Sequence, residues 1–255
     1  QIGEQWLLRK NLEKAEEFLN LSLASAGMNN RALALQSVLL NHQGNEAGLL
    51  DLYRYEQLLL PNQVQVSEAF GTTAEFNRQL VECLDKHVTM EQDPQGQATV
   101  NGLHSRSISH IQDPAMVEMN RLIGVAFKHA AEQAALVQNH LYPGWLPQRQ
   151  ILDSWTVRLR AGGFQRPHIH PRAWLSGCYY VKIPAEVHSG EANKAGWIEF
   201  GSPDEKYAVS NPLALRSHEP NEGDLVTFPS YYWHNTVPFS SDEERISLAF
   251  DICPA

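Results

Sequence analysis

The spacing of apolar residues divides the chain into two parts. Up to about residue 141, apolar positions recur at helical spacing, which predicts amphipathic helices. Beyond about residue 151, short runs of β-branched and aromatic residues alternate with Gly, Pro, Asn and Asp, which predicts strands joined by turns. The Pro-Gly-Trp-Leu-Pro segment at 143–147 lies between the two parts, and we expect the chain to turn there.

The first part contains five expected helices. Their apolar patterns cover residues 5–25, 29–42, 45–60, 74–88 and 115–138, and Pro61 is expected to stop the third. Thr72 and Glu75 have the spacing of a capping box, which predicts the start of the fourth. Ala15 and Leu49 are one 34-residue step apart, the period of a tetratricopeptide repeat. Because such stacks normally need three repeats, a plain helical hairpin stays open for this segment.

The second part contains six expected strands, and many short strands after a helical block predict a β-sandwich or barrel braced by helices. We therefore expect a helical segment over residues 1–70 and a domain over 71–255. Within that domain, helical support covers 71–141 and the β core covers 151–255. The expected strands are Trp155–Arg160, Leu175–Ile183, Gly196–Phe200, Asp224–Phe228, His234–Phe239 and Arg245–Phe250.

Composition limits the classes of partner. The formal charge of −9 argues against nucleic acid, because phosphate binding needs a basic face. No stretch reaches the roughly 20 apolar residues that a membrane helix needs, so no membrane partner is expected. Three scattered cysteines fit a reducing compartment, and we expect a cytoplasmic protein. The chain begins at Gln1 rather than Met, so we expect a trimmed fragment. Homo-oligomerisation stays open.

Three histidines are candidate metal ligands. His168 and His170 form an H-x-H pair, and in a strand residues i and i+2 point to the same face, about 6.5 Å apart. The pair alone is a weak signal, because surface or core histidines often occur at this spacing. His234 follows an aromatic run and could be an ordinary core histidine. Three imidazoles suit iron, copper, nickel or zinc, and leave open coordination positions for chemistry.

Arg245 and Ser247 are candidate anchors for a carboxylate. They are two residues apart in an expected strand and would therefore share a face. A guanidinium that points inward beside a hydroxyl can hold a carboxylate through two hydrogen bonds. The alternative is a surface arginine paired with Glu243 or Glu244.

Four segments together resemble a known family. Trp155–Phe164, His168–Val181, Gly223–Phe239 and Arg245–Asp251 are similar to 2-oxoglutarate/Fe(II) oxygenases found at the C-terminus of bacterial tetratricopeptide proteins, and more distantly to prolyl hydroxylases. The resemblance implies a double-stranded β-helix (jelly roll) braced by helices, in the α+β or mainly β class. In that fold the H-x-H strand and a strand some 60 residues later meet at the barrel mouth.

The resemblance also implies roles for the candidate residues. His168 and His234 match the two iron-binding histidines, and His170 stands where most of the superfamily has a carboxylate. On this pattern, an aspartate at 170 would restore the usual ligand set. Arg245 matches the residue that binds the distal carboxylate of 2-oxoglutarate. Tyr180 aligns with a prolyl-hydroxylase tyrosine that helps to hold the same carboxylate, and Ser247 is a further candidate for this contact. For Tyr180, plain strand packing is an equal alternative.

The function implied is a 2-oxoglutarate- and Fe(II)-dependent dioxygenase, which hydroxylates a protein, a peptide or a small molecule with O2 and releases succinate and CO2. A cupin-type dioxygenase with three histidines is the first alternative. Its spacing fits Gly162 to His170, but Trp174 and Leu175 stand where a glutamate is expected, and it has no use for Arg245. A non-catalytic protein-binding module is the second alternative.

Overall fold

The computed structural model describes residues 2–25, 27–188 and 194–255. Its centre is an antiparallel sheet of seven strands in the order β1-β8-β5-β10-β4-β3-β2, and a second sheet has the order β7-β6-β9. Phe200 of the second sheet packs on Phe228 of the first, with ring centroids 4.9 Å apart. The strands are β1 Leu60–Gln63, β2 Met90–Gln92, β3 Thr99–Ser105, β4 Gln150–Gln165, β5 Leu175–Lys182, β6 Ile198–Phe200, β7 Arg216–His218, β8 Asp224–Pro229, β9 His234–Thr236 and β10 Arg245–Pro254.

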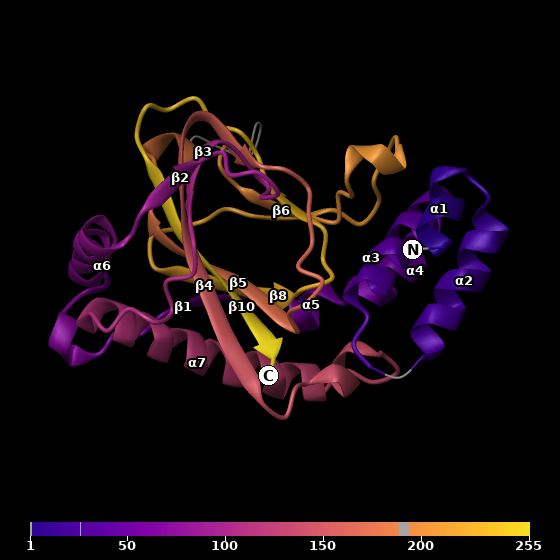
Figure 1. The fold of residues 1–255 in the computed structure, drawn as a ribbon, viewed down its shortest axis with the longest axis horizontal. Coiled ribbons are helices and arrows are strands. Elements are labelled where there is room, and N and C mark those ends of the chain that lie inside the picture. Colours follow the sequence, from indigo (N-terminus) through magenta and orange to yellow (C-terminus); the bar gives the residue numbers. More distant parts are fainter. Residues whose placement is uncertain (1, 26, 189–193) are drawn as a thin grey trace.

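Helices lie on two sides of this β core (Figure 1). Helices α6 and α7 lie along the large sheet and contact β5 and β8, while α1 to α4 gather at one side of the barrel. None of the helices among the described residues is both long and apolar enough to cross a bilayer. The helices are α1 Ile2–Leu8, α2 Leu12–Ala24, α3 Asn30–His42, α4 Glu46–Tyr53, α5 Tyr55–Leu58, α6 Thr73–His87 and α7 Pro114–Ala135.

The sequence predicted the main elements of the β core. A strand lies at each of the six expected places, although β9 ends at Thr236 rather than Phe239. The capping box of Thr72 and Glu75 is present at the start of α6. Two expected helices are interrupted: Lys10, with φ of 56°, separates α1 from α2, and Arg54, with φ of 46°, separates α4 from α5. A left-handed residue cannot continue a right-handed helix, so each helix must end there.

The prediction that the chain is helical up to residue 141 was wrong in three places. Strands β1, β2 and β3 all belong to the large sheet. Pro61 ends no helix but lies inside β1, an edge strand that pairs with β8. Proline is tolerated there because an edge strand has one side without ladder hydrogen bonds. In β3, Asn101 has φ of 50° and the register with β4 shifts between Val100 and Gly102, so the alternation of a strand is hidden.

The first helices pack on the loop that carries the H-x-H pair. The amide of Asn30, at the start of α3, donates to the main-chain oxygens of His170 and Ala173. The indole nitrogen of Trp233 donates to the oxygen of Ala34 in α3, 3.0 Å away. Residues 1–70 therefore supply both the edge strand β1 and a helical support for the loop. A domain boundary near residue 70 stays a prediction.

Candidate functional site

Three histidines converge at one end of the barrel. His234 is the first residue of β9, whereas His168 and His170 lie on the loop between β4 and β5. One ring nitrogen from each residue lies within 4.8 Å of the other two. The expectation that the H-x-H pair lies within a regular strand was wrong, because only His168 forms a bridge, to His234. Main-chain hydrogen bonds of 3.0 and 3.1 Å in both directions between these two residues hold the loop extended.

The hydrogen bonds of the three rings leave one nitrogen of each free. Nδ1 of His168 lies 2.7 Å from the oxygen of Arg166, and Nδ1 of His234 lies 3.0 Å from the oxygen of Tyr232. Nδ1 of His170 lies 2.8 Å from the Asp251 carboxylate. Carbonyl and carboxylate oxygens only accept, so each Nδ1 must carry the proton. The Nε2 atoms then have free lone pairs, and that of His170 is buried without a hydrogen-bond partner.

Burial keeps two of these rings neutral. Burial, together with the neighbouring His170, lowers the pKa of His168 to about 3. Burial beside the other two rings also holds the pKa of His234 well below its usual range. At neutral pH these imidazoles are therefore in the form that binds a metal ion.

Asp251 is a site residue that the sequence analysis missed. Besides His170, its carboxylate accepts a hydrogen bond of 2.6 Å from the hydroxyl of Ser176. The hydroxyl of Ser230 lies 2.7 Å from that of Ser176. One signal for Asp251 was present in the sequence, because the two-residue period of β10 places it on the same face as Arg245 and Ser247.

Arg245 is buried with no acidic partner among the described residues. Its side chain is 3% exposed, and its Nε atom has no hydrogen-bond partner. Its guanidinium lies 5.1 Å from the ring centroid of Tyr180, and its Nη1 lies 3.4 Å from the hydroxyl of Ser247. The alternative of a surface ion pair is wrong, because Glu244 instead pairs with Arg158 and Arg160.

Two partly exposed residues lie between the histidines and Arg245 on the large sheet. Cys178 of β5 and Ala249 of β10 are direct cross-strand partners in the middle of the large sheet. Both are partly exposed, although the strands on which they lie are otherwise mostly buried. By strand alternation they lie between Asp251 at the histidine end and Arg245 at the inner end. We therefore expect the path of a small elongated ligand from the histidines to Arg245 to run along this row of residues.

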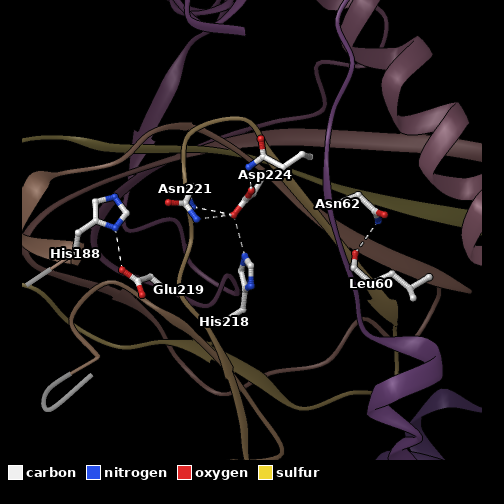
Figure 2. Close-up of polar contacts among 8 residues, drawn as sticks. Leu60, Asn62, His188, His218, Glu219, Asn221 and Asp224 are labelled. Atoms are coloured by element: carbon white, nitrogen blue, oxygen red, sulfur yellow. Dashed lines mark hydrogen bonds and ion pairs between the residues drawn. The ribbon is translucent and has the colours of Figure 1, made fainter. Parts of the chain in front are cut away.

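A polar cluster of His218, Asn221 and Asp224 lies next to Tyr180, and Figure 2 shows His218 and Asn221 both directed at the Asp224 carboxylate. The ring of Tyr180 lies 6.3 Å from that of His218, whose Nε2 is 3.1 Å from the Asp224 carboxylate. Burial raises the pKa of Asp224, but hydrogen bonds from His218 and Asn221 outweigh this and leave the pKa below its usual range. The hydroxyl of Tyr180 is buried without a partner, like Nε of Arg245. The Tyr180 hydroxyl and the Arg245 Nε are therefore two buried hydrogen-bond donors without an acceptor among the described residues.

An open cleft of about 1280 Å³ leads to the histidines. Trp155 of β4 lies in its wall and stacks between two rings, 5.6 Å from His170 and 6.0 Å from His104, with an interplanar angle of 18° in each case. Asp153 and Asp251 also line the cleft and are cross-strand partners. A substrate in the cleft would lie against the histidine cluster and an aromatic wall.

Comparison with known proteins identifies the class of this site. Residues 153–251 match the family described as "Putative 2OG-Fe(II) oxygenase". This segment contains the histidine cluster, Arg245 and Tyr180. The chain therefore contains a 2OG-Fe(II) oxygenase domain, an oxidoreductase of the dioxygenase type whose cofactors are Fe(II) and 2-oxoglutarate. No curated protein sequence matches the chain.

Solved structures agree on the fold, a double-stranded β-helix. A prolyl-4-hydroxylase from Pseudomonas putida matches with a TM-score of 0.51 at 15% identity, over 82% of this chain and 98% of its own. A Trichoplax adhaerens prolyl hydroxylase, solved with a hypoxia inducible factor peptide, gives 0.52 at 10% identity, over 86% and 91%. The α-ketoglutarate-dependent epimerase SnoN from nogalamycin biosynthesis gives 0.52 at 13% identity, over 79% of each chain.

Proposed function

We propose that His168, His170 and His234 hold Fe(II), and that Arg245, with Tyr180 and Ser247, holds the distal carboxylate of 2-oxoglutarate. The enzyme would then hydroxylate a substrate bound in the open cleft. The observation that carries the proposal is the buried guanidinium of Arg245, which has no acidic partner among the described residues. A buried cation is costly unless it is paired, so an anion is expected beside it.

The histidine cluster fits a metal ion. Each Nδ1 donates to a fixed acceptor, and the free Nε2 of His170 is buried without a partner. Bound Fe(II) would supply the chemistry by which O2 hydroxylates the substrate and oxidises 2-oxoglutarate to succinate and CO2. The chain's own part is to orient the three imidazoles, to anchor the co-substrate at Arg245, and to bring the substrate beside the cluster.

The inner end of the barrel fits the co-substrate. A carboxylate there could accept from the guanidinium of Arg245 and from the hydroxyl of Tyr180, which lack partners at Nε and at the oxygen. Charge-assisted hydrogen bonds of this kind are among the strong ones. A cupin-type site and a non-catalytic module would both leave this donor set without a use, so Arg245 favours the oxygenase over either alternative.

The substrate is proposed more broadly, as a polypeptide segment or a bulky small molecule. The cleft of about 1280 Å³ exceeds the usual volume of about 300–1,000 Å³ for small-molecule pockets. Ala15 and Leu49, one repeat period apart, are both fully buried in α2 and α4, which supports a tetratricopeptide-like segment. The three cysteines are free, which supports the expected cytoplasmic location.

The test is the affinity for 2-oxoglutarate of the protein loaded with Co(II), measured by calorimetry. Arg245→Ala should weaken binding by roughly ten-fold to over a hundred-fold, since a hydrogen bond to a charged group contributes about 1.5–3 kcal/mol. Arg160→Ala is the matched control, because Arg160 follows the cross-strand partner of Arg245 but is 72% exposed. Unchanged affinity in Arg245→Ala would show that the anchor is misassigned. Succinate release with Fe(II) and ascorbate tests turnover.

A further inference from the structure

We infer that Asp251 is a positioning residue for His170, and that it brings to the metal centre the negative charge that an H-x-H motif lacks. The inference rests on the proposed metal site. It concerns a residue 81 positions from His170, at the far end of a different strand.

Asp251 belongs to a closed ring of four hydrogen-bonded residues. The main-chain nitrogen of His170 donates to the oxygen of Ser230, 3.0 Å away, and Nδ1 of His170 donates to Asp251. Asp251 accepts from Ser176, so the hydroxyl of Ser230 must donate to that of Ser176. The ring joins the H-x-H loop to β5, to β10 and to the turn after β8. It fixes both the main chain and the side chain of His170.

This arrangement determines which nitrogen of His170 is free. A carboxylate at 2.8 Å requires a proton on Nδ1, so Nε2 keeps its lone pair. Trp155 stacks on the ring, with centroids 5.6 Å apart, and limits its tilt. His168 and His234 have only main-chain oxygens as Nδ1 acceptors. His170 is therefore the one ligand candidate of the three whose Nδ1 partner is charged.

The charge of Asp251 compensates for the carboxylate ligand that most of the superfamily has at the position of His170. Three neutral imidazoles around Fe(II) leave its double positive charge uncompensated, whereas two histidines and a carboxylate remove one unit. Asp251 restores that unit one hydrogen bond further out, through the ring of His170. Carboxylates in such outer positions raise the basicity of the histidine and are worth about 10–100-fold in metal affinity.

A neighbouring acid allows a matched control. Asp153 is the cross-strand partner of Asp251 and lines the same cleft. None of the hydrogen bonds or ion pairs among the described residues joins Asp153 to a ring of the cluster. Asp153→Asn therefore removes the same charge from the same wall and leaves the four-residue ring intact.

The experiment measures Co(II) affinity by calorimetry and, in the metal-free protein, the protonated nitrogen of His170 from its ¹⁵N chemical shifts. Asp251→Asn keeps an acceptor but no charge, and should bind Co(II) about 10–100-fold more weakly. Asp251→Ala loses the acceptor as well, and His170 should no longer hold its proton only on Nδ1. Asp153→Asn should change Co(II) affinity by less than about three-fold, below the range expected for an outer carboxylate.

Two results would overturn the inference. One is an unchanged pattern of His170 nitrogen shifts in a folded Asp251→Ala protein. The other is an equal loss of Co(II) affinity in Asp251→Asn and Asp153→Asn, which would indicate a general effect of charge. If the unmodified protein binds no Co(II), the proposed function fails instead, and the shifts of the metal-free protein still decide the role of Asp251. Ser176→Ala, which removes one donor to Asp251, should give a smaller change of the same kind.

Discussion

Replacing His170 by aspartate is the change for which the sequence pattern and the structure predict opposite effects on metal affinity. By the pattern alone, His170→Asp recreates the two-histidine, one-carboxylate set and should preserve or strengthen metal binding. In the structure, Nδ1 of His170 lies 2.8 Å from the Asp251 carboxylate. Nδ1 is bonded to Cγ, as a carboxylate oxygen of aspartate is. The new carboxylate would therefore face Asp251, and it would also lack the reach of Nε2.

The size of the effect follows from the distance. Two unit charges about 4 Å apart at an effective dielectric constant of about 20 repel by about 4 kcal/mol. Part of this is avoided when the pair binds a proton, but the metal must then displace that proton. We therefore expect His170→Asp to bind Co(II) at least about 100-fold more weakly, which corresponds to about 2.8 kcal/mol.

A double-mutant cycle tests this prediction, because Asp251→Asn should change Co(II) affinity in opposite directions in the two backgrounds. Asp251→Asn should weaken Co(II) binding when residue 170 is histidine. The same change in the His170→Asp protein removes the repulsion and should strengthen binding by about ten-fold or more. The four affinities are measured by calorimetry in one buffer at neutral pH. If His170→Asp binds Co(II) as tightly as the unmodified protein, or if Asp251→Asn weakens both backgrounds equally, the assigned contact between 170 and 251 is wrong.

Three further predictions concern stability and the co-substrate path. Burial lowers the pKa of His104, His140, His168 and His234, so the unfolded chain binds protons below pH 6.5 that the folded chain does not. The free energy of unfolding, measured by urea titration, should therefore fall as pH drops from 6.5 to 5, by about 1.4 kcal/mol per pH unit for each fully depressed histidine, and a flat profile would contradict this. Ala249→Leu should obstruct the path to Arg245, so that calorimetry finds 2-oxoglutarate affinity lost and Co(II) affinity kept; retained 2-oxoglutarate binding would place the path elsewhere. Trp233→Phe should lower the free energy of unfolding by about 1 kcal/mol through loss of the hydrogen bond to Ala34, whereas Trp6→Phe should lower it less, because the half-buried indole of Trp6 donates no hydrogen bond among the described residues.

The sequence predicted best what depends on local patterns. The strands of the β core lie in runs of β-branched and aromatic residues between turn residues, and α6 begins at a capping box, so both were placed correctly. Strands β1 and β2 have only four and three residues, LPNQ and MEQ, and contain no such run. Short edge strands of this kind are specified by the partner strand that they pair with, and that partner is distant in the sequence.

In the site too, the residues within local motifs were predicted, whereas a residue defined by a distant contact was not. His168, His170, His234 and Arg245 became candidates because they stand in segments that resemble a known family. Asp251 could not be assigned by spacing, since its contact with His170 joins residues 81 positions apart. A single aspartate near the end of a strand has many solvated alternatives. Only the cross-strand register, which pairs Asp251 with Ser176, shows that its carboxylate reaches the H-x-H loop.

The loop that carries His168 and His170 has little regular structure of its own, and this gives the first helices a part in the site. A single bridge to His234 and the hydrogen-bonded ring of Asp251 fix one side of the loop. On the other side, Asn30 of α3 donates to the main-chain oxygen of His170, and Trp233, next to His234, is tied to the same helix. An extended loop without a sheet ladder keeps its geometry only if its polar groups are satisfied by neighbours. Residues 1–70 add no histidine or acid to the cluster within the described part of the chain, yet they supply these neighbours. Separating them from the barrel should therefore alter the spacing of the three imidazoles before it unfolds the sheet.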